Sequence, residues 1–304
     1  MIRILKNQKP MRISAYIFIT VFLVSLANCT LDRVNGSNAN TLTEEDLETA
    51  TLILGEAISS NTSGVYLSVQ DLLAIISESG FTPKINPISS NKYQYDQIIN
   101  FRSIYNPDTG VHTVTFERVD EQRQKSESDS LRYIYRDQNG DFVEFPREQQ
   151  SLIETINYSG IKEGTVRDAG KTSSFVRENE FFISNLSSTE ETLSLEGVHS
   201  GNGSISIQSA DGESWQSYYE LTFTFLNIQI VRILNDRNEI IDFSIIGGLN
   251  WEIETWNSPE KLTKSTIISG TQSFIGDGTV VVRFNEADTI IVLDVETGQQ
   301  INTN

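Results

Sequence analysis

The chain has 304 residues, with 23 lysines and arginines against 41 aspartates and glutamates, and a formal net charge of −18. A surface this acidic repels phosphate backbones, so we expect no nucleic-acid partner. The single cysteine excludes an intramolecular disulfide. Aromatic residues, at 15 Phe, 10 Tyr and 3 Trp, are frequent enough to build a packed core.

The N-terminus has the layout of a secretory signal. Ile13 to Leu26 forms an apolar run of 14 residues, shorter than the roughly 20 that a membrane-spanning helix needs. A basic segment followed by such a run predicts a signal peptide over residues 1–28. Its removal takes away four cations and no acid, which leaves 19 basic against 41 acidic residues and a net charge of −22. The four cations are Arg3, Lys6, Lys9 and Arg12.

The residues that end the apolar run, Leu26-Ala27-Asn28-Cys29, resemble the lipobox of bacterial lipoproteins. In that family a leucine and two small residues precede the modified cysteine, and Asn28 stands where alanine, glycine or serine is usual. The resemblance implies cleavage before Cys29, acyl chains attached to Cys29, and anchoring in the bilayer of the cell envelope. Thr30 follows in place of the aspartate that retains such proteins in the inner membrane of Gram-negative bacteria, which favours the outer membrane. An ordinary signal peptide or an uncleaved short anchor is the alternative.

Composition divides the rest of the chain into three parts. Residues 29–41 are polar and rich in turn formers, which predicts a flexible tether. Residues 42–90 show helical spacing of apolar residues, and residues 91–304 show strand spacing. We therefore expect an N-terminal helical segment followed by an antiparallel β domain, built as one sheet or as two sub-sheets.

Two helices are expected in the helical segment. Thr43 is placed as the N-cap of the first, with the acids of "EED" in the first turn. Apolar residues then recur at helical spacing as far as Ile58, and the turn formers "SSNTSG" at residues 59–64 end the pattern. A second apolar stretch, Val65 to Ile76, predicts another helix.

Apolar and polar residues alternate after the helical segment, and turn formers separate the alternating runs, which predicts about a dozen strands joined in hairpins. From Tyr219 to Phe225 the apolar residues hold one phase; the phase then changes to Leu226, Ile228 and Ile230, which predicts a bulge near Asn227. One polar face per strand is typical of antiparallel sheets with one face in water. We expect a mainly β fold with large antiparallel sheet, as a sandwich or a curved half-barrel, and one or two N-terminal helices.

The chain offers few groups for catalysis or metal binding. His112 lies in the alternation of a strand, and His199 lies in the glycine-rich "EGVHSGNGS", which we interpret as a connection. With no HExxH spacing and no cysteine partner, a zinc site is not expected. No GxSxG motif marks a nucleophilic serine, and we expect neither catalytic residues nor a cofactor.

The stretch "RDQNGDFVEFPRE" has two interpretations. Asp137, Asn139, Asp141 and Glu148 fall at the first, third, fifth and twelfth positions of a calcium-binding loop, but Phe142 stands where that loop requires glycine. Asn139-Gly140 between two alternating runs is also a strong hairpin signal. We favour the hairpin and keep Asp137, Asn139 and Asp141 as weak metal-ligand candidates.

Three aromatic residues, Trp215, Tyr218 and Trp256, have two interpretations as well. They form a face that contacts sugars or lipids, or they pack in the core and at a sheet edge, as such residues commonly do.

Together these features favour a non-catalytic, lipid-anchored envelope protein. Its β domain would bind or scaffold an envelope protein, a glycan or a lipid on a concave sheet face, covered by the helices, with residues that the sequence does not identify. The first alternative is a carrier that holds lipid or other amphipathic cargo in the cavity of a curved sheet. The second is a glycan-active enzyme, which requires two carboxylates roughly 5 to 10 Å apart in a cleft.

Overall fold

The computed structural model describes residues 42–73, 97–121, 124–168, 170–187, 192–208, 214–234, 240–258 and 265–301, all within one compact unit, Leu42–Asn304. The expected signal peptide and tether, with Cys29 at their junction, lie outside these residues.

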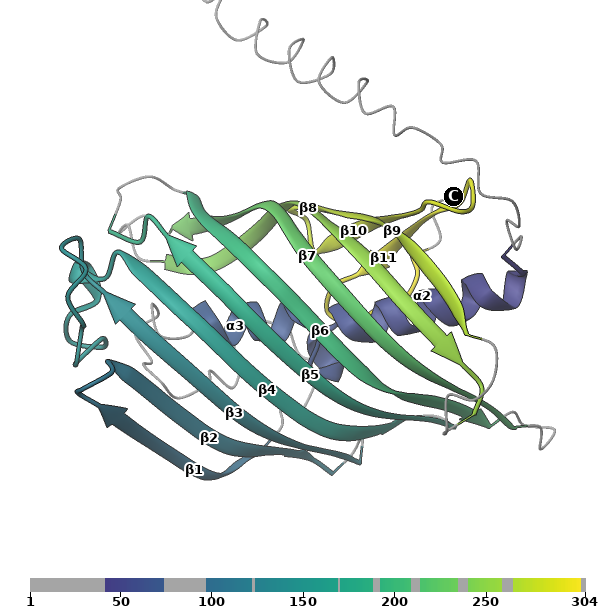
Figure 1. The fold of residues 1–304 in the computed structure, drawn as a ribbon, viewed down its shortest axis with the longest axis horizontal. Coiled ribbons are helices and arrows are strands. Elements are labelled where there is room, and N and C mark those ends of the chain that lie inside the picture. Colours follow the sequence, from purple (N-terminus) through teal and green to yellow (C-terminus); the bar gives the residue numbers. More distant parts are fainter. Residues whose placement is uncertain are drawn as a thin grey trace, which may run out of the picture. The chain divides into compact units, whose positions relative to one another are not determined.

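The described residues form one antiparallel sheet of eleven strands, in which each strand pairs with its neighbours in the sequence (Figure 1). The sheet is open, with β1 and β11 as its two edges. The expected mainly β fold with large antiparallel sheet and two N-terminal helices is therefore confirmed, as a single sheet and not as a sandwich. The strands are β1 (Gln97–Asn106), β2 (Val111–Asp120), β3 (Lys125–Arg136), β4 (Thr155–Asp168), β5 (Lys171–Ser184), β6 (Thr192–Gln208), β7 (Ser214–Leu234), β8 (Ile240–Trp256), β9 (Thr266–Ile275), β10 (Thr279–Phe284) and β11 (Ile290–Asp294).

The strands have the alternation that the sequence predicts. In β3, side chains from Lys125 to Tyr135 are buried at every second position and mostly exposed between them. In β7, the pairing with β8 shifts between Leu226 and Gln229, and Asn227 has a left-handed backbone with φ of 54°. The bulge near Asn227 is thus confirmed. It leaves Leu226 on the outer face, 45 % exposed, so the second buried phase begins at Ile228.

The first helix, α2 (Glu44–Ile58), begins as predicted. The Thr43 side chain accepts a hydrogen bond from the Asp46 backbone N–H, and the Asp46 carboxylate accepts one from the Thr43 N–H at 2.9 Å. A 3-10 turn, η1 (Ser60–Thr62), follows, and α3 (Val65–Leu73) starts at the expected residue. The end of the second expected helix lies outside the described residues. One more 3-10 turn, η3 (Gln150–Leu152), lies between β3 and β4.

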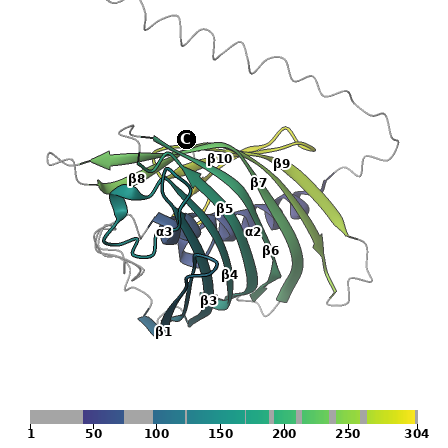
Figure 2. The same ribbon diagram turned by 60° about the vertical axis from the view of Figure 1, so that its left-hand side comes forward.

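Both helices pack along the concave side of the curved sheet (Figure 2). Ile53, Leu54 and Ile58 of α2, with Leu72 of α3, have no exposed area. Burying a side chain of this size contributes about 1.5–3 kcal/mol. The concave face, where we expected a binding site, is therefore filled by helix side chains in this part of the chain.

The C-terminal end of α2 is fastened to the turn that follows β11. The Ser59 hydroxyl donates to the Glu296 carbonyl at 2.5 Å, and the Ser60 N–H donates to the Val295 carbonyl at 3.2 Å. Gly55 allows this close approach, because a Cβ there would lie 2.2 Å from the carbonyl oxygen of Gly298. The first helix and the last strand, far apart in the sequence, thus fix each other.

Candidate functional site

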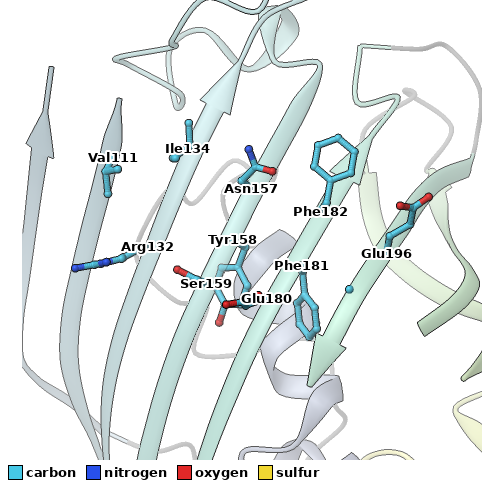
Figure 3. Close-up of a pocket in the computed structure, with 11 residues that line it drawn as sticks. Val111, Arg132, Ile134, Asn157, Tyr158, Ser159, Glu180, Phe181, Phe182 and Glu196 are labelled. Atoms are coloured by element: carbon cyan, nitrogen blue, oxygen red, sulfur yellow. The ribbon is translucent and has the colours of Figure 1, made fainter. Parts of the chain in front are cut away.

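A hollow of about 540 Å³ lies on the outer face of the sheet, on the side opposite the helices, across β2 to β6 (Figure 3). Its apolar part comes from Ile134, which is half-buried, and Phe182, which is 37 % exposed. Its charged rim is Arg132, Glu180 and Glu196, all exposed to solvent. The hollow therefore combines an exposed aromatic ring with charges of both signs.

A bulge in β6 shapes this hollow. The pairing of β6 with β7 shifts between Leu195 and Val198, and Gly197 between them has φ of 145°. A Cβ on Gly197 would lie 2.1 Å from the Glu180 carbonyl oxygen, so only glycine lets the two strands approach here. Bulges are frequent beside functional sites, where they redirect side chains.

The hollow also brings two carboxylates onto neighbouring strands. Phe182 pairs with Glu196 and Glu180 pairs with Val198, so the two glutamates are diagonal neighbours. Such neighbours lie about 7–8 Å apart in a regular ladder, with their Cβ atoms somewhat closer. Both side chains are exposed, and a general acid for glycoside hydrolysis needs apolar surroundings that favour its protonated form.

A second group of chemically active side chains lies on the inner face, between α3 and β2 to β4. Asp71 of α3 accepts from Arg118 at 2.7 Å and from Lys162 at 2.5 Å. Asp129 lies 3.2 Å from Arg118 and 3.0 Å from Lys162, and Glu127 lies 3.3 Å from Lys125. All six side chains are at most 5 % exposed. We call this set the α3 ion network: Asp71, Arg118, Lys125, Glu127, Asp129 and Lys162.

The electrostatics of the α3 ion network are those of a closed, balanced cluster. It has three acids and three bases, and Ser63 donates a further hydrogen bond to Glu127. Burial, together with the charge of Glu127, raises the pKa of Asp129 to about 7. Burial would also raise the pKa of Glu127, but the charges of Lys125 and Lys162 outweigh it and lower that pKa strongly. Every charged side chain here has a partner, so we interpret the network as the attachment of α3 to the sheet.

The two histidines lie apart, on β2 and β6. His112 is buried, as its strand phase indicated, and its Nε2 lies 3.2 Å from the Val143 carbonyl. Burial lowers the pKa of His112. The interpretation of the stretch around His199 as a connection is wrong, because His199 lies within β6 and has no exposed area. Its glycines mark close packing against neighbouring side chains, and not a loop.

The weak metal-ligand candidates do come together, in a turn. The Asp137 carboxylate accepts from the backbone N–H groups of Asn139 at 2.8 Å and Asp141 at 2.9 Å, and the Asn139 side chain also donates to it. Desolvation would raise the pKa of Asp137, but these hydrogen bonds together outweigh it and lower that pKa. Arg136 bridges to Phe142 across the turn, which confirms the hairpin. In the described ranges no three His, Cys, Asp or Glu side chains are grouped to hold a metal ion.

The three aromatic candidates are divided between the two faces. Tyr218 and Trp256 pair across β7 and β8 and stack with 6.4 Å between ring centroids. Trp215 packs against the core in the opposite phase of β7. They do not form one contact surface.

Sequence reasoning missed the buried charges, because it treated polar residues in strands as solvent-facing. The signal was present in the phase of each strand. Glu127 and Asp129 keep the phase of Leu131 in β3, and Arg177 keeps the phase of Phe175 in β5. Applied consistently, the period of two places these charges on the inner face.

A comparison with protein-family models, curated proteins and solved structures finds no match for this chain. Within the described part of the chain, no helix combines the length and the apolar character needed to cross a membrane.

Proposed function

We propose that the protein is a lipid-anchored envelope lipoprotein whose outer sheet face binds a partner polypeptide and catalyses no reaction. The hollow across β2 to β6 carries the binding part of this proposal, since it presents Phe182 beside charges of both signs on an open surface. The anchor and the outer-membrane location rest on Leu26-Ala27-Asn28-Cys29 and on Thr30.

Charge complementarity favours a basic partner segment that carries a large apolar side chain. Beyond the signal peptide the chain has 19 basic against 41 acidic residues. The rim of the hollow repeats this excess, with two glutamates, Glu180 and Glu196, against one cation, Arg132. A cationic segment is steered toward such a face, while its apolar side chain buries Phe182.

One observation supports a glycan-active enzyme as the second candidate. Glu180 and Glu196 are diagonal neighbours in the hollow, at a spacing suited to paired carboxylates. Their exposure favours binding over catalysis. Replacing both with glutamine would abolish hydrolysis of envelope glycans by an enzyme, and would only weaken cationic binding by a non-catalytic surface.

The carrier alternative places cargo on the concave face. There α2 and α3 pack their apolar side chains against the sheet, and the α3 ion network fastens α3. A carrier would need the helices to move before cargo entered. We therefore place the primary binding surface on the outer face.

The binding proposal is tested with a displayed library of random peptides selected on the full-length protein. We expect the selected peptides to combine lysine or arginine with an aromatic or large aliphatic residue. In fluorescence anisotropy, Phe182→Ser should bind the selected peptides with an affinity at least about tenfold lower, as expected for a central contact residue. Ile161→Ser is the matched control, since Ile161 is 51 % exposed on the same face but does not line the hollow.

Acidic selected peptides, no selected peptide, or equal affinities of Phe182→Ser and Ile161→Ser would each contradict the proposed surface.

The anchor is tested by metabolic labelling with a radioactive fatty acid in bacterial cells. We expect the wild type to incorporate label and Cys29→Ser to incorporate none, because the thiol is the attachment point. Asn28→Ala is the control, and should keep or increase the labelling, since alanine is usual at that position. Label on Cys29→Ser would refute the lipoprotein assignment.

A further inference from the structure

Arg177 on β5 is a fully buried cation whose donors are unused. Its side chain points to the inner face and has no exposed area. Its Nε, Nη1 and Nη2 have no hydrogen-bond partner among the described residues. A guanidinium stays protonated in proteins, and a buried charge without partners is strongly unfavourable. These nitrogens therefore need a negatively charged acceptor, which the described part of the chain does not supply.

The guanidinium is held in place by its surroundings. Its Cζ lies 5.4 Å from the ring centroid of Phe175 and 5.7 Å from that of Tyr219. It rests on β6 at a glycine: a Cβ on Gly201 would lie 3.1 Å from Nη1 of Arg177. Likewise, a Cβ on Gly203 would lie 2.8 Å from the Tyr219 hydroxyl. The glycine-rich stretch of β6 thus provides the room that these side chains occupy.

Polar atoms of the neighbouring residues are also unused. His199 and Asn179, which face each other on β6 and β5, are joined at 2.7 Å between Nδ1 and Oδ1. His199 Nε2 and Asn179 Nδ2 have no hydrogen-bond partner among the described residues. Burial raises the pKa of Tyr219, and the Arg177 guanidinium, which lies beside the Tyr219 hydroxyl, acts against this larger effect. Burial and the positive charge of Arg177 lower the pKa of His199, so its ring is neutral. Because the Asn179 oxygen can only accept, the proton of this neutral ring is on Nδ1 and Nε2 is an acceptor. The donors beside the single positive charge are therefore Asn179 Nδ2 and the Tyr219 hydroxyl.

The neighbouring charges do not neutralise Arg177. Lys162 lies directly opposite it on β4 and is itself paired with Asp71 and Asp129. Glu56 of α2 binds Ser173 at 2.5 Å and Lys171 at 2.9 Å through Oε1. The Oε2 of Glu56 has no partner and is not within the 4.0 Å of Arg177 that would define an ion pair.

We propose that Arg177, Asn179 and Tyr219 form an internal site for one small monovalent anion, beneath α2, with His199 orienting the Asn179 amide. Carboxylate and halide ions match the forked donors of an arginine in a confined space. A single negative charge balances the single unpaired cation, whereas a dianion would leave a buried excess. The same chemistry has two sources: a free ion, such as formate or bromide, and the carboxylate end of an acyl chain.

The first test follows thermal unfolding of the full-length protein in a non-ionic detergent and a chloride-free sulfate buffer of constant ionic strength, since the site should not accept a dianion. We expect bromide and formate to raise the midpoint in a saturable way, by roughly 3–5 °C at a tenfold excess over Kd. Arg177→Met should lose this response. The matched control is Arg167→Met, since Arg167 lies on the outer end of β4 and is exposed.

Octanoate separates the two sources. If octanoate raises the unfolding midpoint at a much lower concentration than formate does, the natural ligand is the carboxylate end of an acyl chain. If octanoate and formate act at equal concentrations, the natural ligand is a free ion. No saturable response to any of the three, or the same response in Arg177→Met, would overturn the site.

A second measurement does not depend on the folding of a variant. Crystals of the wild type grown in bromide should show an anomalous peak within hydrogen-bond distance of the Arg177 guanidinium. A buried water only, or Glu56 Oε2 bonded directly to Arg177, would overturn the inference.

Discussion

Replacing Asp71 with asparagine tests whether the α3 ion network holds α3 on the sheet. The change removes one negative charge and nearly no volume. In the wild type this carboxylate binds Arg118 at 2.7 Å and Lys162 at 2.5 Å, and its side chain is 5 % exposed. The asparagine amide can accept from one cation but turns N–H groups toward the other.

The expected loss of stability in Asp71→Asn follows from the charges that remain in the network. The network changes from three acids and three bases to two acids and three bases. Breaking a buried ion pair from one side costs about 3–5 kcal/mol. Part of this is offset, because Asp71 is one of the charges that raise the pKa of Asp129; without it, Asp129 ionises more readily. We therefore expect a loss near the lower limit, about 3 kcal/mol, or about 6–12 °C in the unfolding midpoint.

The assay is urea unfolding of wild type and Asp71→Asn at neutral pH, with hydrogen exchange as the local measurement. Amides of α3 should exchange much faster in the variant, while those in the centre of β8, far from the network, should change less. Glu48→Gln on the exposed side of α2 is the control, since it removes the same charge from solvent-facing surface. Surface charges of this kind contribute roughly 0–1 kcal/mol.

Two results would refute the reasoning. One is a loss of stability in Asp71→Asn no larger than in Glu48→Gln. The other is a large global loss with no selective increase of exchange in α3, which would show that the network stabilises the sheet without holding the helix.

Three further predictions concern single positions. The pKa of Asp129 is raised from 3.8 to about 7 in the folded protein, so its ionisation should lower the free energy of unfolding as pH rises from about 4 to 7, by an amount on the order of 4 kcal/mol. In Asp129→Asn, the free energy of unfolding measured in urea should depend less on pH over that range. An unchanged pH dependence in the variant would contradict the prediction. Gly203→Ala should lower stability by about 1–3 kcal/mol in the same assay, because its Cβ would lie 2.2 Å from the Ser174 carbonyl oxygen. An unchanged stability would contradict this, since it would mean that β5 and β6 can move apart at no cost. Thr43→Ala should cost about 1 kcal/mol through loss of the helix cap, with Thr43→Ser, which keeps the hydroxyl, as the control that restores it.

Local features of this protein were predictable from its sequence. The cap at Thr43, the start of the second helix at Val65 and the bulge at Asn227 each depend on residues within one turn or one strand. The hairpin at Asn139-Gly140 is equally local. A period of two in the apolar residues also determined that the sheet is antiparallel with one buried face.

Tertiary structure decided what depends on neighbours across strands. The sequence does not specify that all strands join one sheet in sequential order, or that α2 and α3 fill its concave side. It shows Phe182 and Glu196 as ordinary outer-face residues; only the register of β5 with β6 places them side by side in the hollow. Lys162 and Arg177 are opposite each other for the same reason.

The physical reason is that side-chain periodicity is encoded along the chain, whereas pairing and burial arise from contacts between distant segments. A polar residue in the buried phase of a strand appears unfavourable when the strand is considered alone. In the fold, Asp129 finds Lys162 on the next strand, while Arg177 rests between aromatic rings without an acceptor. The sequence alone thus determined the strands and their faces, and the packing of α2 and α3 on one sheet decided which polar groups became partners.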